Sequence, residues 1–190
     1  MKKIADEIGV PFIYSFEICS AIDGDCSPKD LQVNLSEILE NEFNNYYEQI
    51  QSGRRQEKKE ISQIEKDLIA NDSIYTCNVA LNSFVIDYTG KMLPCMKLRH
   101  HGVKLTKDNY DQIWHDFKKY SELKCSKDYK CHGCDSRYYC DICPAEMEFL
   151  YHDMEYRNDN ICLCAKIRKQ FYNGEIAFDE ALKRAAHHQS

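Results

Sequence analysis

The 190-residue sequence lacks the features of several common classes of protein. No stretch approaches the ~20 consecutive apolar residues of a membrane-spanning helix. The first residues, MKKIADEIGVPFIYSF, are interrupted by Asp6 and Glu7, unlike the apolar region of a signal peptide. Glycine-rich nucleotide loops and a nucleophile elbow are also missing. With a net charge of −6, the chain has no basic excess for nucleic acid. We therefore expect a cytoplasmic protein that binds neither membranes nor nucleic acid.

Cysteine is what the sequence has in excess. There are 11 cysteines, an odd number, and in a reducing compartment we do not expect them to form a disulfide framework. Nine of them follow Thr76, and four fall within the segment KCHGCDSRYYCDICPAE, residues 130–146: Cys131, Cys134, Cys140 and Cys143. Because two residues between thiols let one tight turn aim both sulfurs at one metal, this spacing suits Zn²⁺ and iron–sulfur clusters alike.

The pattern around the cysteines predicts a mixed fold. SFVIDYTGKMLPCMKL, residues 83–98, has two β-prone arms and a turn at Gly90, which is typical of a β-hairpin. Hydrophobic periodicity and possible caps predict helices over residues 34–51, 54–70, 109–123, 145–156 and 162–174. The fold class is therefore expected to be α+β: a small domain of one β-hairpin with helices.

Seven cysteines and one glycine follow one another in a fixed order. They read Cys77-x12-Gly90-x4-Cys95, a gap, Cys131-x2-Cys134-x5-Cys140-x2-Cys143, a second gap, and Cys162. On these residues the chain resembles the SPASM domain, the auxiliary-cluster module at the carboxyl end of many radical S-adenosylmethionine (SAM) enzymes. CNVALNSFVIDYTGKMLPC resembles its opening hairpin, and YYCDICPAEMEF with ICLCAKIRK resembles its close.

The resemblance implies a division of the chain into four parts. Residues 1–32 resemble the last strand and exit loop of a partial TIM barrel, with the strand expected over residues 8–18. Residues 33–72 would be a helical linker, residues 73–170 the SPASM-like cluster domain, and residues 171–190 a carboxyl-terminal helical tail.

The resemblance also implies two 4Fe–4S clusters and their ligands. The first cluster would take Cys77, Cys95 and Cys143. The second would take Cys131, Cys134, Cys140 and Cys162. Since neither set comes from one local segment, loading would tie the hairpin to the last helical stretch and add folding energy.

Some ligand positions stay open. The segment ANDSIYT, just before Cys77, offers no fourth ligand for the first cluster. Cys125 or Cys164 could supply it, or one iron could remain open and bind substrate. Cys164 also competes with Cys162 as the terminal ligand, and we expect Cys162. Four histidines are candidate ligands by residue type, although we expect them at the surface or around the ligands: His100, His101, His115 and His132.

One absence bears on catalysis. Radical SAM enzymes cleave their cofactor at a cluster held by Cys-x3-Cys-x2-Cys, and this spacing does not occur in the chain. We therefore do not expect catalysis by the chain alone. By resemblance, it would be the auxiliary part of an enzyme that modifies peptides or proteins, serving electron transfer or substrate binding. Its partners would be a radical SAM catalytic core, a peptide or protein substrate, and an electron donor.

Two alternatives to this interpretation remain. The chain could be a zinc-binding structural or interaction module, in which four cysteines close each site and there is no redox role. It could also be a remnant that binds neither metal tightly.

Overall fold

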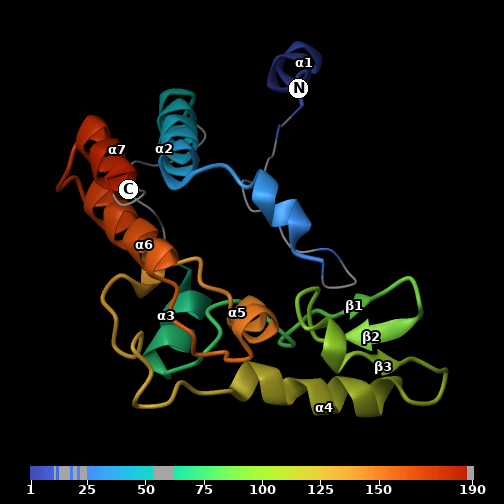
Figure 1. Ribbon diagram of the computed structural model, residues 1–190. Helices are drawn as coiled ribbons and strands as arrows, with labels where there is room; N and C mark the ends of the chain where they lie inside the picture. The colour runs from blue at the N-terminus through green and yellow to red at the C-terminus, as the bar shows by residue number, and fades with distance from the viewer. Residues whose placement is uncertain (11, 13–17, 19–20, 22–24, 54–61, 188–190) are drawn as a thin grey trace.

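A computed structural model describes residues 1–10, 12, 18, 21, 25–53 and 62–187 of the chain. Helices and one small antiparallel sheet make up the described part, which confirms the α+β class (Figure 1). No helix in this part is long and apolar enough to cross a membrane. The elements are α1 (Lys2–Ile8), η1 (Ser27–Leu31), α2 (Leu35–Gln51), α3 (Gln63–Ala70), β1 (Val85–Ile86), β2 (Lys91–Leu93), η2 (Arg99–His101), β3 (Val103–Lys104), α4 (Tyr110–Glu122), η3 (Arg137–Tyr139), α5 (Pro144–Tyr151), α6 (Asp159–Tyr172) and α7 (Phe178–Ala186).

The expected β-hairpin is confirmed. Strands β1 and β2 pair antiparallel, with Val85 opposite Leu93. The chain turns at Gly90, whose φ of 76° is the left-handed conformation that glycine adopts without a steric penalty. A third strand, β3, pairs with the other edge of β2 and was not expected from the sequence. The sheet order is thus β1-β2-β3.

The first hydrophobic core lies between this sheet, α4 and the start of α5. Helix α4 buries the face that its periodicity predicted, through Ile113, Phe117 and Tyr120. These residues pack in one cluster with the fully buried Met92 and Leu98 of the sheet region. The hairpin is therefore fixed against a helix rather than standing alone, as a two-stranded sheet needs for stability.

A second hydrophobic core is built by α2, α6 and α7, which lie together on the side of the molecule away from the sheet (Figure 1). Phe43 of α2 stacks on Phe171 of α6 at 3.8 Å between ring centroids, and Ala181 and Ala185 of α7 close the cluster. Helix α2 begins as expected, because the Asn34 side chain accepts a hydrogen bond from the N–H of Glu37. Helix α2 lies in the expected linker, residues 33–72, and α7 lies in the expected tail, residues 171–190. Both helices thus share a hydrophobic core with α6.

Two element boundaries differ from the sequence-based expectation. Helix α3 begins at Gln63, because Ser62 and Glu65 form a reciprocal capping box that fixes its first turn; residues 54–61 lie outside the described part. At the amino terminus, Ile8 is the last residue of α1 and Gly9 closes that helix with a φ of 76°. Most of the strand expected over residues 8–18 lies outside the described residues.

Candidate metal centres

Four cysteines from two separate segments of the chain line one pocket, and we call them the pocket group: Cys131, Cys134, Cys140 and Cys162. Ile142 and Ala165 supply apolar walls, while Arg137 and Asn158 contribute polar ones. These four thiols are the same set that the resemblance implied for the second cluster.

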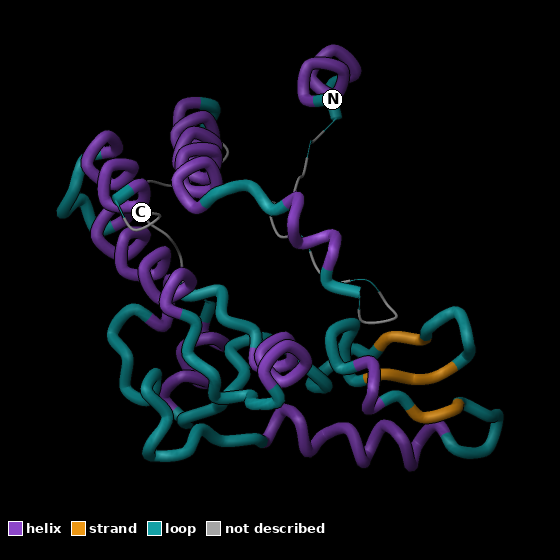
Figure 2. Tube along the Cα trace, in the orientation of Figure 1, coloured by secondary structure: helices purple, strands orange, loops and turns teal. Residues whose placement is uncertain are grey.

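Local backbone geometry aims the pocket group inward. The segment between α4 and α5 is mostly loop, with only η3 as regular structure (Figure 2). Its first Cys-x2-Cys turn is closed by the N–H of Cys134, which donates to the carbonyl of Cys131 at 3.2 Å, and Gly133 takes a φ of 66°. A second turn follows, in which the N–H of Cys140 donates to the carbonyl of Arg137. Tight turns of this kind place successive sulfurs on one side of the loop.

The fourth member of the pocket group comes from the first turn of α6. The N–H of Cys162 donates to the carbonyl of Asn158, whose side chain caps the helix by accepting from the N–H groups of Asn160 and Ile161. The cap therefore fixes the position of Cys162 at the start of the helix.

Burial raises the pKa of two members of the pocket group. Desolvation raises the pKa of Cys140 to about 11, and it also raises the pKa of Cys131. The Tyr129 hydroxyl and the Arg137 guanidinium oppose the shift at Cys131, whereas the neighbouring sulfurs of Cys134 and Cys162 add to it. Because metals bind the thiolate, loading this site must release protons.

A second set of thiols gathers at the hairpin, and we call it the hairpin group: Cys77, Cys95 and Cys143. Cys77 lies in the exposed loop before β1, Cys95 follows β2, and Cys143 immediately precedes α5. All three thiols act on the buried phenol of Tyr75: its pKa is raised first by burial and then by the negative charges of Cys143, Cys95, Glu148 and Cys77. The hairpin and the start of α5 thus bring together the three cysteines implied for the first cluster.

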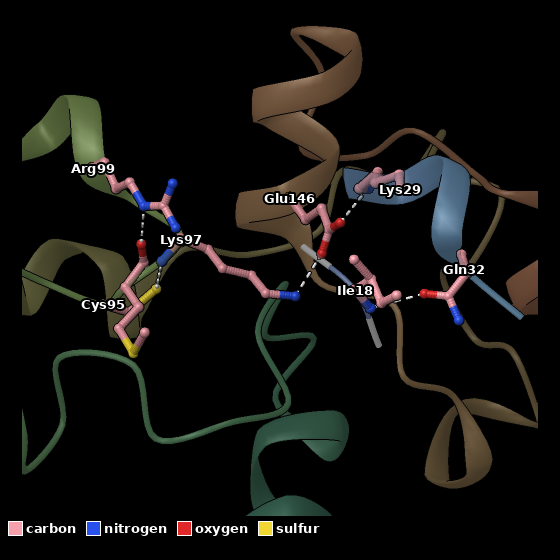
Figure 3. Close-up of polar contacts among 8 residues, drawn as sticks. Ile18, Lys29, Gln32, Cys95, Lys97, Arg99 and Glu146 are labelled. Atoms are coloured by element: carbon pink, nitrogen blue, oxygen red, sulfur yellow. Dashed lines mark hydrogen bonds and ion pairs between the residues drawn. The ribbon is translucent and has the colours of Figure 1, made fainter. Parts of the chain in front are cut away.

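Backbone N–H groups point at sulfur in both groups. The N–H of Lys97 donates to Sγ of Cys95 at 3.3 Å (Figure 3). The N–H of Ile142 similarly lowers the pKa of Cys140, in opposition to the larger effect of burial. Such donors stabilise thiolates and, around iron–sulfur clusters, adjust the reduction potential.

The two spare cysteines lie elsewhere. Sγ of Cys125 accepts from Nη1 of Arg137 at 3.3 Å and faces the carbonyl of Ser73 at 3.6 Å. Cys164 is buried in the second core against α2 and α7. Cys162 and Cys164 therefore face different surroundings although they are two residues apart, and only Cys162 lines the pocket.

The histidines expected at the surface or around the ligands divide into two kinds. Nε2 of His132 lies 3.3 Å from a carboxylate oxygen of Asp72, and the exposed His115 pairs with Asp116 at 3.8 Å. His100 and His101 both approach Glu148. None of the four lines the pocket.

The spacing of the sulfurs bears on which metal the thiols suit. Within the described part of the chain, no three cysteine sulfurs lie within 4.8 Å of one another. A tetrahedral zinc site with Zn–S distances of about 2.3 Å would bring its sulfurs to about 3.8 Å from each other. A 4Fe–4S cluster spreads its four thiolates further apart, because each one binds a different iron. The donor set, four thiols around one pocket, therefore fits an iron–sulfur cluster.

Comparison with known families agrees with this geometry. Residues 77–135 match the family model of the SPASM domain, an iron-sulfur cluster-binding domain. This stretch of the chain is therefore similar to an iron-sulfur cluster-binding domain of a kind typical of radical SAM enzymes. A search of curated proteins and a search of solved structures found no match. The matched residues end before Cys140, so the convergence of Cys140, Cys143 and Cys162 on the two groups comes from the fold.

Sequence reasoning missed a positioning residue of this region, Arg137. This side chain is buried, and its Nη2 donates to the carbonyls of Ser73 and Ile74 at 2.6 and 3.0 Å. It thereby joins the cysteine-rich loop to the chain just before Cys77. Nothing in the sequence separates this arginine from an exposed one, since its partners are main-chain atoms 63 and 64 residues away.

Proposed function

We propose that the chain is the auxiliary part of a radical SAM enzyme and carries two 4Fe–4S clusters, one on each thiol group. The single observation that carries this proposal is the pocket lined by four thiols from two distant segments. The SPASM match supports iron rather than zinc. When bound, the clusters would supply one-electron transfer or an iron that binds substrate.

The hairpin group supplies three thiols, and we propose that its fourth ligand comes from outside the chain. Cys164 faces the second core, which argues against it as the missing ligand, and the Sγ of Cys125 is directed toward Arg137 and the carbonyl of Ser73. An iron without a protein ligand is a site where a substrate or partner group can bind. This favours a role in substrate binding for the first cluster.

The same proposal assigns residues 1–32 to the end of a partial TIM barrel, residues 33–72 to a linker, residues 73–170 to the cluster domain and the rest to a tail. One contact supports an ordered junction. Lys29 of η1 and Lys97 both donate to the carboxylate of Glu146 on α5, at 2.6 and 2.5 Å (Figure 3). A catalytic core preceding the cluster domain would thus be anchored beside the hairpin group.

The partners of this function are a radical SAM core, a peptide or protein substrate and an electron donor.

Reconstitution with iron and sulfide under anaerobic conditions tests the cofactor assignment. The intact chain should give a brown protein with about eight irons, four for each cluster. Cys131→Ser and Cys77→Ser should each remove about half of the iron, and Cys26→Ser, outside both groups, should remove none. A colourless product that binds two zinc ions instead would contradict the proposal.

A further inference from the structure

A ligand set of another kind lies beside the hairpin group. Nε2 of His100 lies 3.3 Å from Oε2 of Glu148, and Nε2 of His101 lies 3.2 Å from the same oxygen. All three ligand atoms are within 4.8 Å of one another. Among the residues that the structure describes, this is the one group of three or more His, Cys, Asp or Glu that converges so closely.

These distances match those between neighbouring ligand atoms that are bound to one metal ion. Histidine nitrogen and carboxylate oxygen bind Zn²⁺ at about 2.0–2.2 Å, so neighbouring ligand atoms lie about 3.0 Å apart in an octahedron and about 3.4 Å apart in a tetrahedron. The observed separations of 3.2 and 3.3 Å fall between these values. An ion could therefore be bound with little movement of the side chains.

The fold holds the three ligands from two separate elements. His100 and His101 belong to η2, which directly follows the fully buried Leu98, and Glu148 belongs to α5. The His101 ring also packs edge-on against the buried Tyr120 of α4, at 5.2 Å between centroids. The convergence is thus a product of tertiary packing, because the histidines and the glutamate lie 47 residues or more apart in the sequence.

Solvent can reach this site. The exposed fractions of the side chains are 46% for His100, 27% for His101 and 24% for Glu148. Three protein ligands with water access are typical of metal sites that keep a coordination position open. The donor set of two imidazoles and one carboxylate suits zinc, iron and nickel.

We propose that His100, His101 and Glu148 form a mononuclear site for one divalent transition-metal ion, with at least one position left for water or a substrate group. The site lies close to the hairpin group, because the charge of Glu148 acts on the Tyr75 phenol together with the three sulfurs of that group. Its ligands are separate from both thiol groups, so the proposal does not rest on the iron–sulfur assignment.

The test uses the full chain with its thiols already loaded by iron and sulfide, and Zn²⁺ as the probe. Isothermal titration should show one Zn²⁺ site. His101→Ala and Glu148→Gln should each weaken it at least tenfold. His100→Ala, which changes an exposed side chain, should do the same, while His115→Ala should leave it unchanged. Iron content and circular dichroism of each variant should equal those of the parent chain.

X-ray absorption at the zinc edge then identifies the ligands. With one equivalent of Zn²⁺, a shell of nitrogen and oxygen with the scattering pattern of imidazole supports the site. Equal affinity in all four variants and the parent would overturn the proposal and leave two hydrogen bonds to Glu148 as the explanation of the geometry. A nitrogen and oxygen shell that is unchanged in His101→Ala would overturn it as well, whereas a sulfur shell at the zinc would contradict the iron loading of the thiols.

Discussion

Cys162 and Cys164 lie on the same helix, yet one faces the pocket and the other faces the second core. An α-helix turns by about 100° per residue, so side chains two residues apart point about 200° away from each other. This geometry gives the two thiols different roles in our account. Cys162 would bind iron, and Cys164 would fill space between α6 and α2.

We predict that Cys162→Ser and Cys164→Ser differ in iron content. The first change removes a thiolate from the pocket group and should reduce iron by about half, because a cluster with three protein ligands is held less tightly. The second should leave iron unchanged. Iron analysis of protein purified without oxygen measures both. Equal losses in two well-folded variants would contradict the assignment of Cys162.

The burial of Cys164 predicts a pH dependence. Desolvation raises the pKa of this thiol in the folded chain from an ordinary 9.0 to about 11, partly offset by Arg168. Because the unfolded thiol ionises first, the stability that this group contributes is complete below pH 9 and is lost as the pH rises to 11. Between these limits the parent chain should lose about 2–3 kcal/mol relative to Cys164→Ala.

Denaturant unfolding of the parent and of Cys164→Ala at several pH values measures this difference. The test depends on how the difference in the free energy of unfolding between the two proteins changes with pH. Its absolute size is not informative, because the alanine variant leaves a small cavity at every pH. Two stability curves that run parallel from about pH 8 to about pH 11 would show that Cys164 does not ionise as its burial requires.

Among elements, the hairpin depends on Gly90. The left-handed conformation there costs a non-glycine residue about 1–2 kcal/mol, and a Cβ would also come within 3.1 Å of Nζ of Lys104. We predict that Gly90→Ala destabilises the chain by about that amount. Gly90→Asn should cost less, because asparagine tolerates this conformation better. Thermal unfolding followed by circular dichroism checks both, and an alanine variant as stable as the parent would contradict the strained turn.

The elements differ in how far the sequence could predict them. Helix α4 and the hairpin were predictable because periodicity and one glycine determine them locally. The start of α3 was missed although the Ser62–Glu65 capping box is visible in the sequence, because the charged run before it continues the helical pattern. Strand β3 could not be found, since two residues carry no periodicity and form a strand only by pairing with β2.

For the molecule as a whole, Arg168 connects the second core to the cysteine-rich loop. This buried arginine of α6 pairs with Glu42 of α2 at 2.8 Å and with Asp141, which lies between Cys140 and Cys143. Its guanidinium thus spans the helical side and the metal side of the chain. Sequence patterns do not reveal this link, because its partners lie 126 and 27 residues away.

We predict that Arg168→Ala lowers the free energy of unfolding by about 2–3 kcal/mol, because it leaves Glu42 without its charged hydrogen-bond partner in a half-buried position. Arg168→Lys should recover part of the loss. The matched control is Arg184→Ala, which removes an exposed pair with Glu180 on α7 and should change stability far less than Arg168→Ala does. Chemical denaturation of the three variants measures these values. Equal effects of Arg168→Ala and Arg184→Ala would contradict the connecting role.

At this scale the cysteine order predicted two ligand sets, and the four cysteines of one set line a single pocket, whereas the fold around them was predicted less well. The order of cysteines was informative because metal ligation restricts spacing. The packing of α2 and α7 on α6 was not predictable, since amphipathic helices do not specify their partners. Tertiary contacts likewise brought His100, His101 and Glu148 together.

The central claim is that thiols from distant segments hold iron–sulfur clusters. X-ray absorption at the iron and zinc edges of protein purified without oxygen tests it most directly. The account predicts iron with a shell of sulfur and a second shell of iron, with no zinc coordinated by four sulfurs. A well-folded protein that contains zinc in tetrahedral sulfur coordination, or that contains no iron, would contradict it.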